Sequence, residues 1–290
     1  MTAIAFITAA TMPKPDLETG ALVARMAQRG VAAVQLAWDA DADWASYDLV
    51  LLRTPWDYVE RLDAFLAWIG TVDRVTRLRN PASTIVWNAH KRYLLALQAA
   101  GVPVVETLLL RPADTPDLAA ALAAFGDREM VAKPAIGIGA GGALRGAADA
   151  PAMRRHIGAL LERGDVLVQP FLPAIETSGE TSLIYIDGRY SHAVRKRPKA
   201  GDYRVQDHHG GSVSPHEASA LERATAQRAL EAAPDPTLYA RIDLVEQGGR
   251  PVVMELELIE PELFLRFSES GTEAYLAAAL AAAQDTRTTA

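Results

Sequence analysis

Short apolar runs alternate with helix-like segments over the first third of the chain. Three runs have the composition of strands: Ile4–Thr8, Val31–Trp38 and Asp48–Arg53. Residues 16–29 have a helical pattern that Gly30 can end as a C-terminal cap. Strand, helix and strand in this order predict a parallel sheet with crossover helices. Ligands of such sheets bind at the carboxyl ends of the strands, so Arg53 and Asp57, which leave the third run there, are candidate substrate residues.

The middle of the chain changes to shorter elements around a glycine-rich stretch. Met130–Pro134 predicts a strand that runs into Gly137–Gly146, and a helix over Ala152–Arg163 is followed by a strand at Val166–Gln169. Thr115-Pro116 predicts a helix start, because a capping residue precedes proline.

The last third has an antiparallel pattern. Ser182–Ile186 and Tyr190–Val194 predict a hairpin, because Asp187-Gly188 between them tolerates the positive φ angles of a tight turn. A polar loop is expected over residues 199–212, with His208-His209 exposed to solvent. After it, Ser214-Pro215-His216-Glu217 has the form of a capping box and predicts a helix to about residue 232.

Acidic side chains gather on the two strands predicted after that helix, at 238–245 and 251–259. Glu255 and Glu257 are two residues apart, so they share a face and lie about 6.6 Å apart along the strand. Asp243 joins them if both apolar faces pack on one core. A two-residue turn at Gly248-Gly249 would pair Asp243 with Met254 instead, so we expect an odd-numbered loop with glycine in a left-handed conformation.

Oxygen ligands without histidine or cysteine favour Mg²⁺ or Mn²⁺ over zinc. The alternative for Asp243, Glu255 and Glu257 is a set of solvated acids on an outer sheet face. A basic counterpart lies upstream, where Lys133 ends a strand and could reach a phosphate. The glycines after it allow backbone N–H groups to approach an anion, although a flexible surface turn has the same composition.

Composition and charge exclude several classes of function. The 290 residues include 36 acidic and 29 basic side chains and no cysteine, which excludes disulfides and thiolate chemistry and disfavours nucleic-acid binding. Apolar runs are too short for a membrane span and the first residues do not have the pattern of a secretory leader, so we expect a cytoplasmic protein that handles small molecules.

Several ordered motifs resemble those of ATP-grasp ligases, in the branch of ribosomal-protein S6 glutamate ligases and bacterial glutathione synthetases. They cover about residues 88–265 and are, in chain order, His90-Lys91-Arg92-Tyr93-Leu94, Gly101-Val102-Pro103-Val104, Val131-Ala132-Lys133-Pro134 with the glycine stretch, Val168-Gln169-Pro170-Phe171, Glu180–Lys196, Gly201-Asp202-Tyr203-Arg204, Tyr239–Val245 and Met254–Glu257. The resemblance implies an α/β fold that becomes α+β in its C-terminal part. It also implies an N-terminal α/β domain (1–86), a central nucleotide-binding lobe (87–168) and a C-terminal lobe (169–290).

The resemblance assigns roles to these positions. It implies that Asp243, Glu255 and Glu257 hold Mg²⁺ or Mn²⁺, and that Arg195 or Arg204 stabilises an acyl phosphate or clamps a substrate carboxylate. Lys196, beside Arg195, is expected to be solvated. The residues implied in ATP binding are Lys91 and Lys133 at the phosphates, Gly137, Gly139, Gly141 and Gly142 in a covering loop, and Gln169, Pro170 and Phe171 at the adenine.

The chain departs from the glutamate-ligase pattern in ways that bear on its substrate. Glu257 stands where the family has asparagine, and Ser182 stands where glutamate ligases have arginine. Glu260 lies where the family has a Ser-Pro-Gly segment near the acceptor site, so Glu260 is a further candidate substrate residue.

Motifs in the N-terminal third resemble a narrower subfamily, which contains the cyclo-ligase that forms D-cycloserine from O-ureido-D-serine. They include Arg53-Thr54-Pro55-Trp56-Asp57-Tyr58, Arg79-Asn80-Pro81 and Trp87-Asn88-Ala89-His90-Lys91. This resemblance implies an ATP-dependent ligase that activates an amino-acid-type carboxylate for attack by nitrogen, within one molecule or between two. A phosphotransferase and an ATP-binding scaffold without turnover remain alternatives, and self-assembly stays open.

Overall fold

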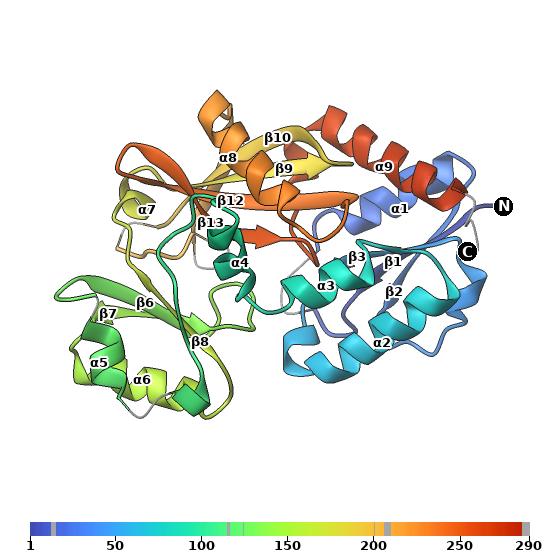
Figure 1. Cartoon of the computed structure of the whole chain (residues 1–290). Helices are drawn as coiled ribbons and strands as arrows, with labels where there is room; N and C mark the ends of the chain where they lie inside the picture. Colours follow the sequence, from blue (N-terminus) through green and yellow to red (C-terminus); the bar gives the residue numbers. More distant parts are fainter. Residues whose placement is uncertain (13–15, 115–116, 124, 200, 206–209, 286–290) are drawn as a thin grey trace.

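The structure of the chain is a computed structural model in which three sheets succeed one another along the sequence (Figure 1). It describes residues 1–290 except 13–15, 115–116, 124, 200, 206–209 and 286–290. The Thr115-Pro116 helix start and the exposed His208-His209 pair, both predicted from sequence, lie outside the described residues.

The first sheet is parallel, with the strand order β2-β1-β3-β4, as the alternating pattern predicted. Its strands are β1 (Ala3–Thr8), β2 (Ala32–Ala37), β3 (Leu49–Thr54) and β4 (Leu78–Arg79). Its helices are α1 (Thr19–Gln28) and α2 (Leu62–Val75), and short 3₁₀ turns lie at Trp44–Ser46 and Tyr58–Glu60. Gly30 ends α1 with φ of +73°, which confirms its predicted place after the helix.

The second sheet is antiparallel, with the order β5-β8-β6-β7. Its strands are β5 (Leu108–Leu110), β6 (Glu129–Pro134), β7 (Leu144–Ala147) and β8 (Val166–Pro170). Two helices, α5 (Leu118–Ala123) and α6 (Pro151–Leu161), cover one face, and a 3₁₀ turn lies at Pro112–Asp114. Met153 and Ile157 of α6, one turn apart, pack on Met130 and Val168 of the sheet.

The third sheet is antiparallel, with the order β11-β10-β9-β12-β13. Its strands are β9 (Glu180–Ile186), β10 (Arg189–Arg197), β11 (Ser212–His216), β12 (Tyr239–Gln247) and β13 (Arg250–Glu257). The remaining helices are α3 (Ala82–Asn88), α4 (Tyr93–Ala99), α7 (Ala174–Thr177), α8 (Ala220–Glu231) and α9 (Glu269–Gln284), with a 3₁₀ turn at Leu265–Phe267. None of the helices in the described part of the chain combines the length and apolarity that crossing a membrane requires.

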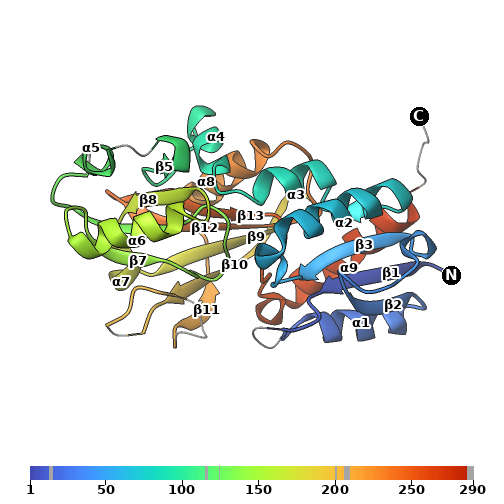
Figure 2. The ribbon, with the colours of Figure 1, turned by 90° about the horizontal axis from the view of Figure 1, so that it is seen from below.

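The first and third sheets share a core. Figure 2 shows α2 and α3 on one side of the first sheet and α1 and α9 on the other. Ile4 and Phe6 of β1 pack in one cluster with Tyr275 of α9 and with Ile184 and Val194 of the third sheet. The three-domain division therefore remains a proposal: each proposed part has its own sheet, but the C-terminal helix completes the core of the first part.

One helix prediction was wrong. Ser214, Pro215 and His216, expected to begin a capping box, instead lie in β11, which pairs with β10. The capping box begins five residues further on, where Ser219 caps α8 and the Glu222 carboxylate accepts from the Ser219 backbone N–H. Both stretches have a serine followed three residues later by glutamate, and the local pattern cannot distinguish them because pairing with β10 decides between them.

The hairpin of β12 and β13 brings the acids together by a different device from the one expected. Gln247 pairs with Arg250 across a two-residue turn, in which Gly248 and Gly249 both have positive φ. Leu244 pairs with Val253, whereas Asp243 pairs with Glu255, so Met254 is an extra residue in β13. A β-bulge, rather than an odd-numbered loop, therefore aligns Asp243 with Glu255.

Asn80 connects the first sheet to the strands of the third. Its buried side chain donates to the carbonyls of Tyr239 (2.9 Å) and Leu258 (2.7 Å) and accepts from the N–H of Leu238 (2.7 Å). Asn80→Ala should lower the free energy of unfolding by about 3 kcal/mol, because it leaves buried backbone groups without partners. Urea denaturation measures this change. The exposed Gln98→Ala in α4 should change it by less than about 0.5 kcal/mol, and equal effects of the two variants would contradict this role for Asn80.

Candidate active site

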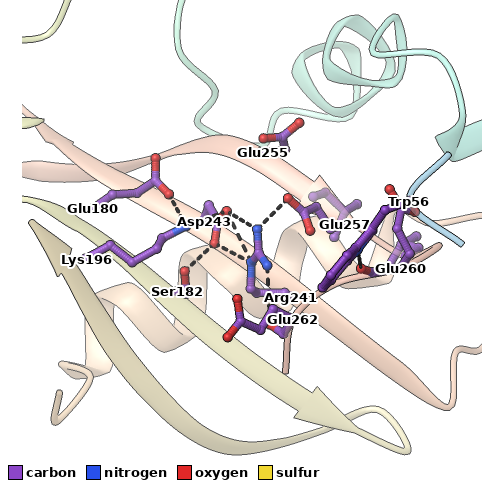
Figure 3. Close-up of polar contacts among 12 residues, drawn as sticks. Trp56, Glu180, Ser182, Lys196, Arg241, Asp243, Glu255, Glu257, Glu260 and Glu262 are labelled. Carbon is purple, nitrogen blue, oxygen red and sulfur yellow. Dashed lines mark hydrogen bonds and ion pairs between the residues drawn. The ribbon is translucent and has the colours of Figure 1, made fainter. Parts of the chain in front are cut away.

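One face of the third sheet changes from apolar to charged along its length. At one end, Ile184, Ile186 and Val194 pack against the first sheet. At the other end the same alternation presents polar side chains, because paired residues of neighbouring strands point to the same side. These residues are Glu180 and Ser182 of β9, Lys196 of β10, Arg241 and Asp243 of β12, and Glu255 and Glu257 of β13 (Figure 3).

This charged face forms the floor of a cavity of about 360 Å³. Lys91 and Asn88, at and just before the turn between α3 and α4, line it on one side, and Trp56 and Tyr58 reach it from the segment after β3. A second cavity of about 110 Å³ contains Lys133 and shares Lys91 and Glu255 with the first. The acids and both lysines of the sequence hypothesis therefore lie around connected cavities.

Asp243, Glu255 and Glu257 form a carboxylate cluster whose ligand oxygens lie within 4.8 Å of one another. Burial raises the pKa of Glu257 to about 7, and its acidic neighbours Glu255 and Asp243 add to the rise. The cations around the cluster therefore do not fully balance its negative charge when no ion is bound. Three carboxylates in a negatively charged, partly buried cavity fit a divalent cation that prefers oxygen ligands.

Two cations hold Asp243 in place. Arg241 Nη2 lies 2.9 Å and Lys196 Nζ 3.0 Å from the Asp243 carboxylate, and Ser182 donates a further hydrogen bond to it. Burial raises the pKa of Asp243, but Arg241 and Lys196 outweigh that effect and hold the pKa below its ordinary value. Arg241 also binds Glu257, and Lys196 also binds Glu180.

Lys196 and Arg195 have exchanged the roles expected from the sequence. Lys196, expected to be solvated, is buried in the site, whereas Arg195, the candidate catalytic residue, points to the opposite face and contacts Thr181 and His216. Adjacent residues of a strand point to opposite faces, so only one of the pair can reach the cavity. Arg241 was missed altogether, although its alternation with Asp243 on one strand was a signal for it.

The nucleotide-binding candidates line the second cavity, with one exception. Gln169, Pro170 and Phe171 at the end of β8 line it together with Lys133, whose pKa is lowered by burial. Gly137, Gly139 and Gly141 line it as well, whereas Gly142 instead takes a positive φ (+70°) where a Cβ would meet Pro134. Arg204 lies at the same cavity and pairs with Asp202 at 2.7 Å.

Lys91 connects the two cavities. Its Nζ lies 3.1 Å from a Glu255 carboxylate oxygen and donates to the carbonyl of Gly137. Burial opposes its charge, but Glu255 outweighs burial and raises the pKa of Lys91 above its ordinary value. Lys91 is therefore a buried ammonium group held against the carboxylate cluster.

Arg53 and Asp57 do not line either cavity. Arg53 is 2% exposed, pairs with Glu18 at 3.2 Å and lies over the Tyr275 ring. Asp57 accepts a hydrogen bond from the Trp38 indole (2.8 Å) and pairs with Arg61 (2.7 Å), which fixes the turn after β3. The expected substrate contacts are thus replaced by packing contacts, and the residues flanking Asp57 reach the cavity instead.

The backbone around Glu257 is held by side chains from the α3–α4 segment. Asn88 donates to the carbonyl of Leu256 and accepts from the N–H of Leu258, both at 2.8 Å. The Tyr93 hydroxyl accepts the N–H of Leu256 at 3.1 Å. Asn88 and Tyr93 therefore position the strand that carries two of the three acids, a role that no sequence pattern indicated.

Glu260 lies in the cavity, beyond the end of β13, beside Trp56 and Glu257 (Figure 3). The Trp56 indole N–H donates to the Glu260 carbonyl at 3.3 Å, and the Tyr58 hydroxyl donates to the Glu260 carboxylate. Burial and the neighbouring Glu257 raise the pKa of Glu260 to about 8. Glu260, a candidate substrate residue from the sequence, therefore lines the larger cavity, and its contact with a substrate stays a prediction.

Comparison with known proteins places this site in a family. Residues 4–80 match the N-terminal domain of D-cycloserine synthetase DcsG, and residues 106–251 match the ATP-grasp domain of prokaryotic glutathione synthetase. The cycloserine biosynthesis protein DcsG of Streptomyces lavendulae is 34% identical over 294 aligned positions, which cover 92% of this chain and 94% of that protein. The chain belongs to the ATP-grasp ligase family. It is therefore an ATP-dependent ligase, and members of its family bind ATP with a divalent metal.

Solved structures agree with this assignment. The crystal structure of D-cycloserine synthetase DcsG matches with a TM-score of 0.85 and 32% identity, and the match covers 95% of this chain and 98% of that one. D-alanine–D-alanine ligase from Bacillus anthracis matches with a TM-score of 0.76 over 98% of this chain and 97% of that one. At 16% identity the second match supports the ATP-grasp fold alone.

The Glu260 carboxyl should make stability depend on pH in the ligand-free protein. Its pKa is about 8 when folded and near the ordinary 4.5 when unfolded, so the stability it contributes is complete below pH 4.5 and is lost as the pH rises to about 8. Glu260→Gln removes this loss. In denaturant titrations with EDTA, the free energy of unfolding of the variant, relative to that of wild type, should increase by about 1–3 kcal/mol as the pH rises from 4 to 9. A constant difference across this range would contradict the raised pKa.

Proposed function

We propose that this ATP-grasp enzyme activates the carboxylate of a small amino acid for attack by a nitrogen, with ring closure of O-ureido-D-serine as its reaction. The observation that carries the proposal is the similarity to DcsG along nearly the whole chain, including the segment that supplies Trp56 and Tyr58 to the cavity. In this reaction a carboxylate oxygen attacks the γ-phosphorus and ADP leaves. The ureido nitrogen that is bonded to oxygen then attacks the acyl carbon, phosphate leaves and the nitrogen loses its proton. Water removes the carbamoyl group as carbamate, which decomposes to carbon dioxide and ammonia, and D-cycloserine remains.

The residues of the site divide this work by position. Lys133 and the glycine turn at 137–141 lie where phosphates of ATP would be held, and Lys91 lies between them and the acids. Asp243, Glu255 and Glu257 would hold Mg²⁺, which when bound neutralises charge on phosphate oxygens. Arg241 and Lys196 fix Asp243, and Arg241 presents a guanidinium to the cavity floor. Arg204 is the candidate to bind phosphate at the other cavity.

We also propose which metal the enzyme uses, what class of substrate it binds and where it acts. Mg²⁺ or Mn²⁺ suits a cluster of carboxylates without nitrogen or sulfur ligands. The cavity of about 360 Å³ suits a small amino acid better than a polypeptide or nucleic acid. We further propose a cytoplasmic enzyme, because the reaction consumes ATP.

The decisive experiment is ADP release with Mg²⁺ over O-ureido-D-serine, single amino acids and dipeptides, with product analysis. Formation of D-cycloserine together with ADP is expected with O-ureido-D-serine alone. Release of ADP only when two amino acids are present would indicate an intermolecular ligase. A stable phosphorylated product would indicate a phosphotransferase, and ATP binding without ADP release would indicate a scaffold. Each of these three results contradicts the proposal.

Lys133→Met tests the phosphate role of Lys133. The variant should lower kcat/KM for ATP by at least about 100-fold, because a positive charge facing the transferred phosphate is lost. Its free energy of unfolding should stay within about 1 kcal/mol of wild type, because burial already disfavours the charge. The exposed Arg163→Met, at the end of α6, is the control for loss of one positive charge and should keep full activity. Full activity of Lys133→Met would exclude the role.

A further inference from the structure

The carboxylates around the larger cavity differ in whether a cation of the protein forms an ion pair with them. Six acids line this cavity, and five of them form ion pairs within the chain. The pairs are Glu180 with Lys196, Asp243 with Lys196 and Arg241, Glu255 with Lys91, Glu257 with Arg241, and Glu262 with Arg266. Among the residues that the structure describes, no cationic side chain pairs with Glu260.

The surroundings of Glu260 suit a small organic cation. Trp56 and Tyr58 line the cavity with it, the Trp56 indole fixes its backbone carbonyl, and the Tyr58 hydroxyl donates to its carboxylate. Aromatic faces beside a carboxylate attract an ammonium group. A second divalent ion fits poorly here, because Glu260 contributes one carboxylate and its phenol partner is a hydrogen-bond donor held neutral by burial.

The position of Glu260 relative to the metal cluster decides which ammonium group it would meet. Glu257, a member of the cluster, lines the same cavity as Glu260, and Figure 3 shows the two side by side with Trp56. A substrate whose carboxylate reacts at the cluster would therefore have its α-carbon close to Glu260. In an α-amino acid that carbon carries an ammonium group.

We infer that Glu260, flanked by Trp56 and Tyr58, is the subsite for the α-ammonium group of the substrate and restricts the enzyme to carboxylates with a free α-amino group. This inference rests on the proposed function and goes beyond it, because it names the residue that selects amino acids over simple carboxylic acids. Glu260 acts in binding, so its loss should affect the KM of the amino acid more than kcat.

The test compares two compounds on two enzymes. O-ureido-D-serine and its deamino analogue, 3-(ureidooxy)propanoate, are titrated by calorimetry into the full chain with Mg²⁺ and a non-hydrolysable ATP analogue. ADP release is measured in separate assays with ATP. Wild type should bind the amino compound about 10- to 100-fold more tightly than the deamino compound, the effect of one charged contact. In Glu260→Gln this preference should fall to less than about threefold, while affinity for the ATP analogue is unchanged.

Glu262→Gln is the matched control, because Glu262 lines the same cavity but is paired with Arg266. It should retain the wild-type preference for the amino compound. The inference is overturned if Glu260→Gln keeps the preference, if Glu262→Gln loses it equally, or if wild type binds neither compound or both alike. A fall in kcat with unchanged KM would also overturn it, since that pattern indicates proton transfer by Glu260 rather than binding.

Binding and turnover separate this inference from the proposed function. Tight binding of the amino compound that depends on Glu260, without ADP release, would refute ring closure of that compound and leave the ammonium subsite intact. Equal ADP release with the amino and the deamino compound would refute the ammonium subsite and leave the proposed ligase activity intact.

Discussion

Balance of charge on one partly buried sheet face is the constraint on which this site depends. Asp243 lies between Arg241 and Lys196 and is 2% exposed, so its negative charge is stable only because both cations contact it. The same two cations reach Glu257 and Glu180 and so organise the acids of three neighbouring strands. The raised pKa of Glu257 reflects a remaining deficit of positive charge, which a bound metal ion would balance.

The fold makes this arrangement possible by using one sheet face for two purposes. Ile184 and Val194 on that face seal the core shared with the first sheet. Two residues further along the same strands, Ser182 donates to Asp243 and Lys196 lines the cavity. The transition from apolar to charged surface therefore occurs within single strands. Asn80 and Asn88 bind the main chain at the start of β12 and at the end of β13. The strands that carry the acids are therefore anchored to the segment from β4 to the end of α3.

Two kinds of prediction from the sequence differed in outcome. That Glu255 and Glu257 lie on one face follows from the two-residue period of a strand. Asp243 was assigned to the same face by the same argument. The device that aligns Asp243 was not predictable, because the bulge at Met254 is a property of the paired strands. Arg195 and Lys196 show most clearly what the sequence does not predict, since a run of basic residues does not reveal which of them faces the cavity.

The two-residue alternation of strands predicted that Glu255, Glu257 and Asp243 share one face, and the ordered motifs indicated the ATP-grasp fold through their resemblance. The same motifs indicated Lys91 and Lys133, which we propose to bind phosphate. These features depend on contacts between near neighbours or on the period of one element. Only the tertiary structure decided that Arg53 and Asp57 are packing residues, that Arg241 and Lys196 belong to the site and that Glu260 has no cationic partner among the described residues. Such facts depend on which distant segments meet, and charge compensation in a cavity is set by all of them together.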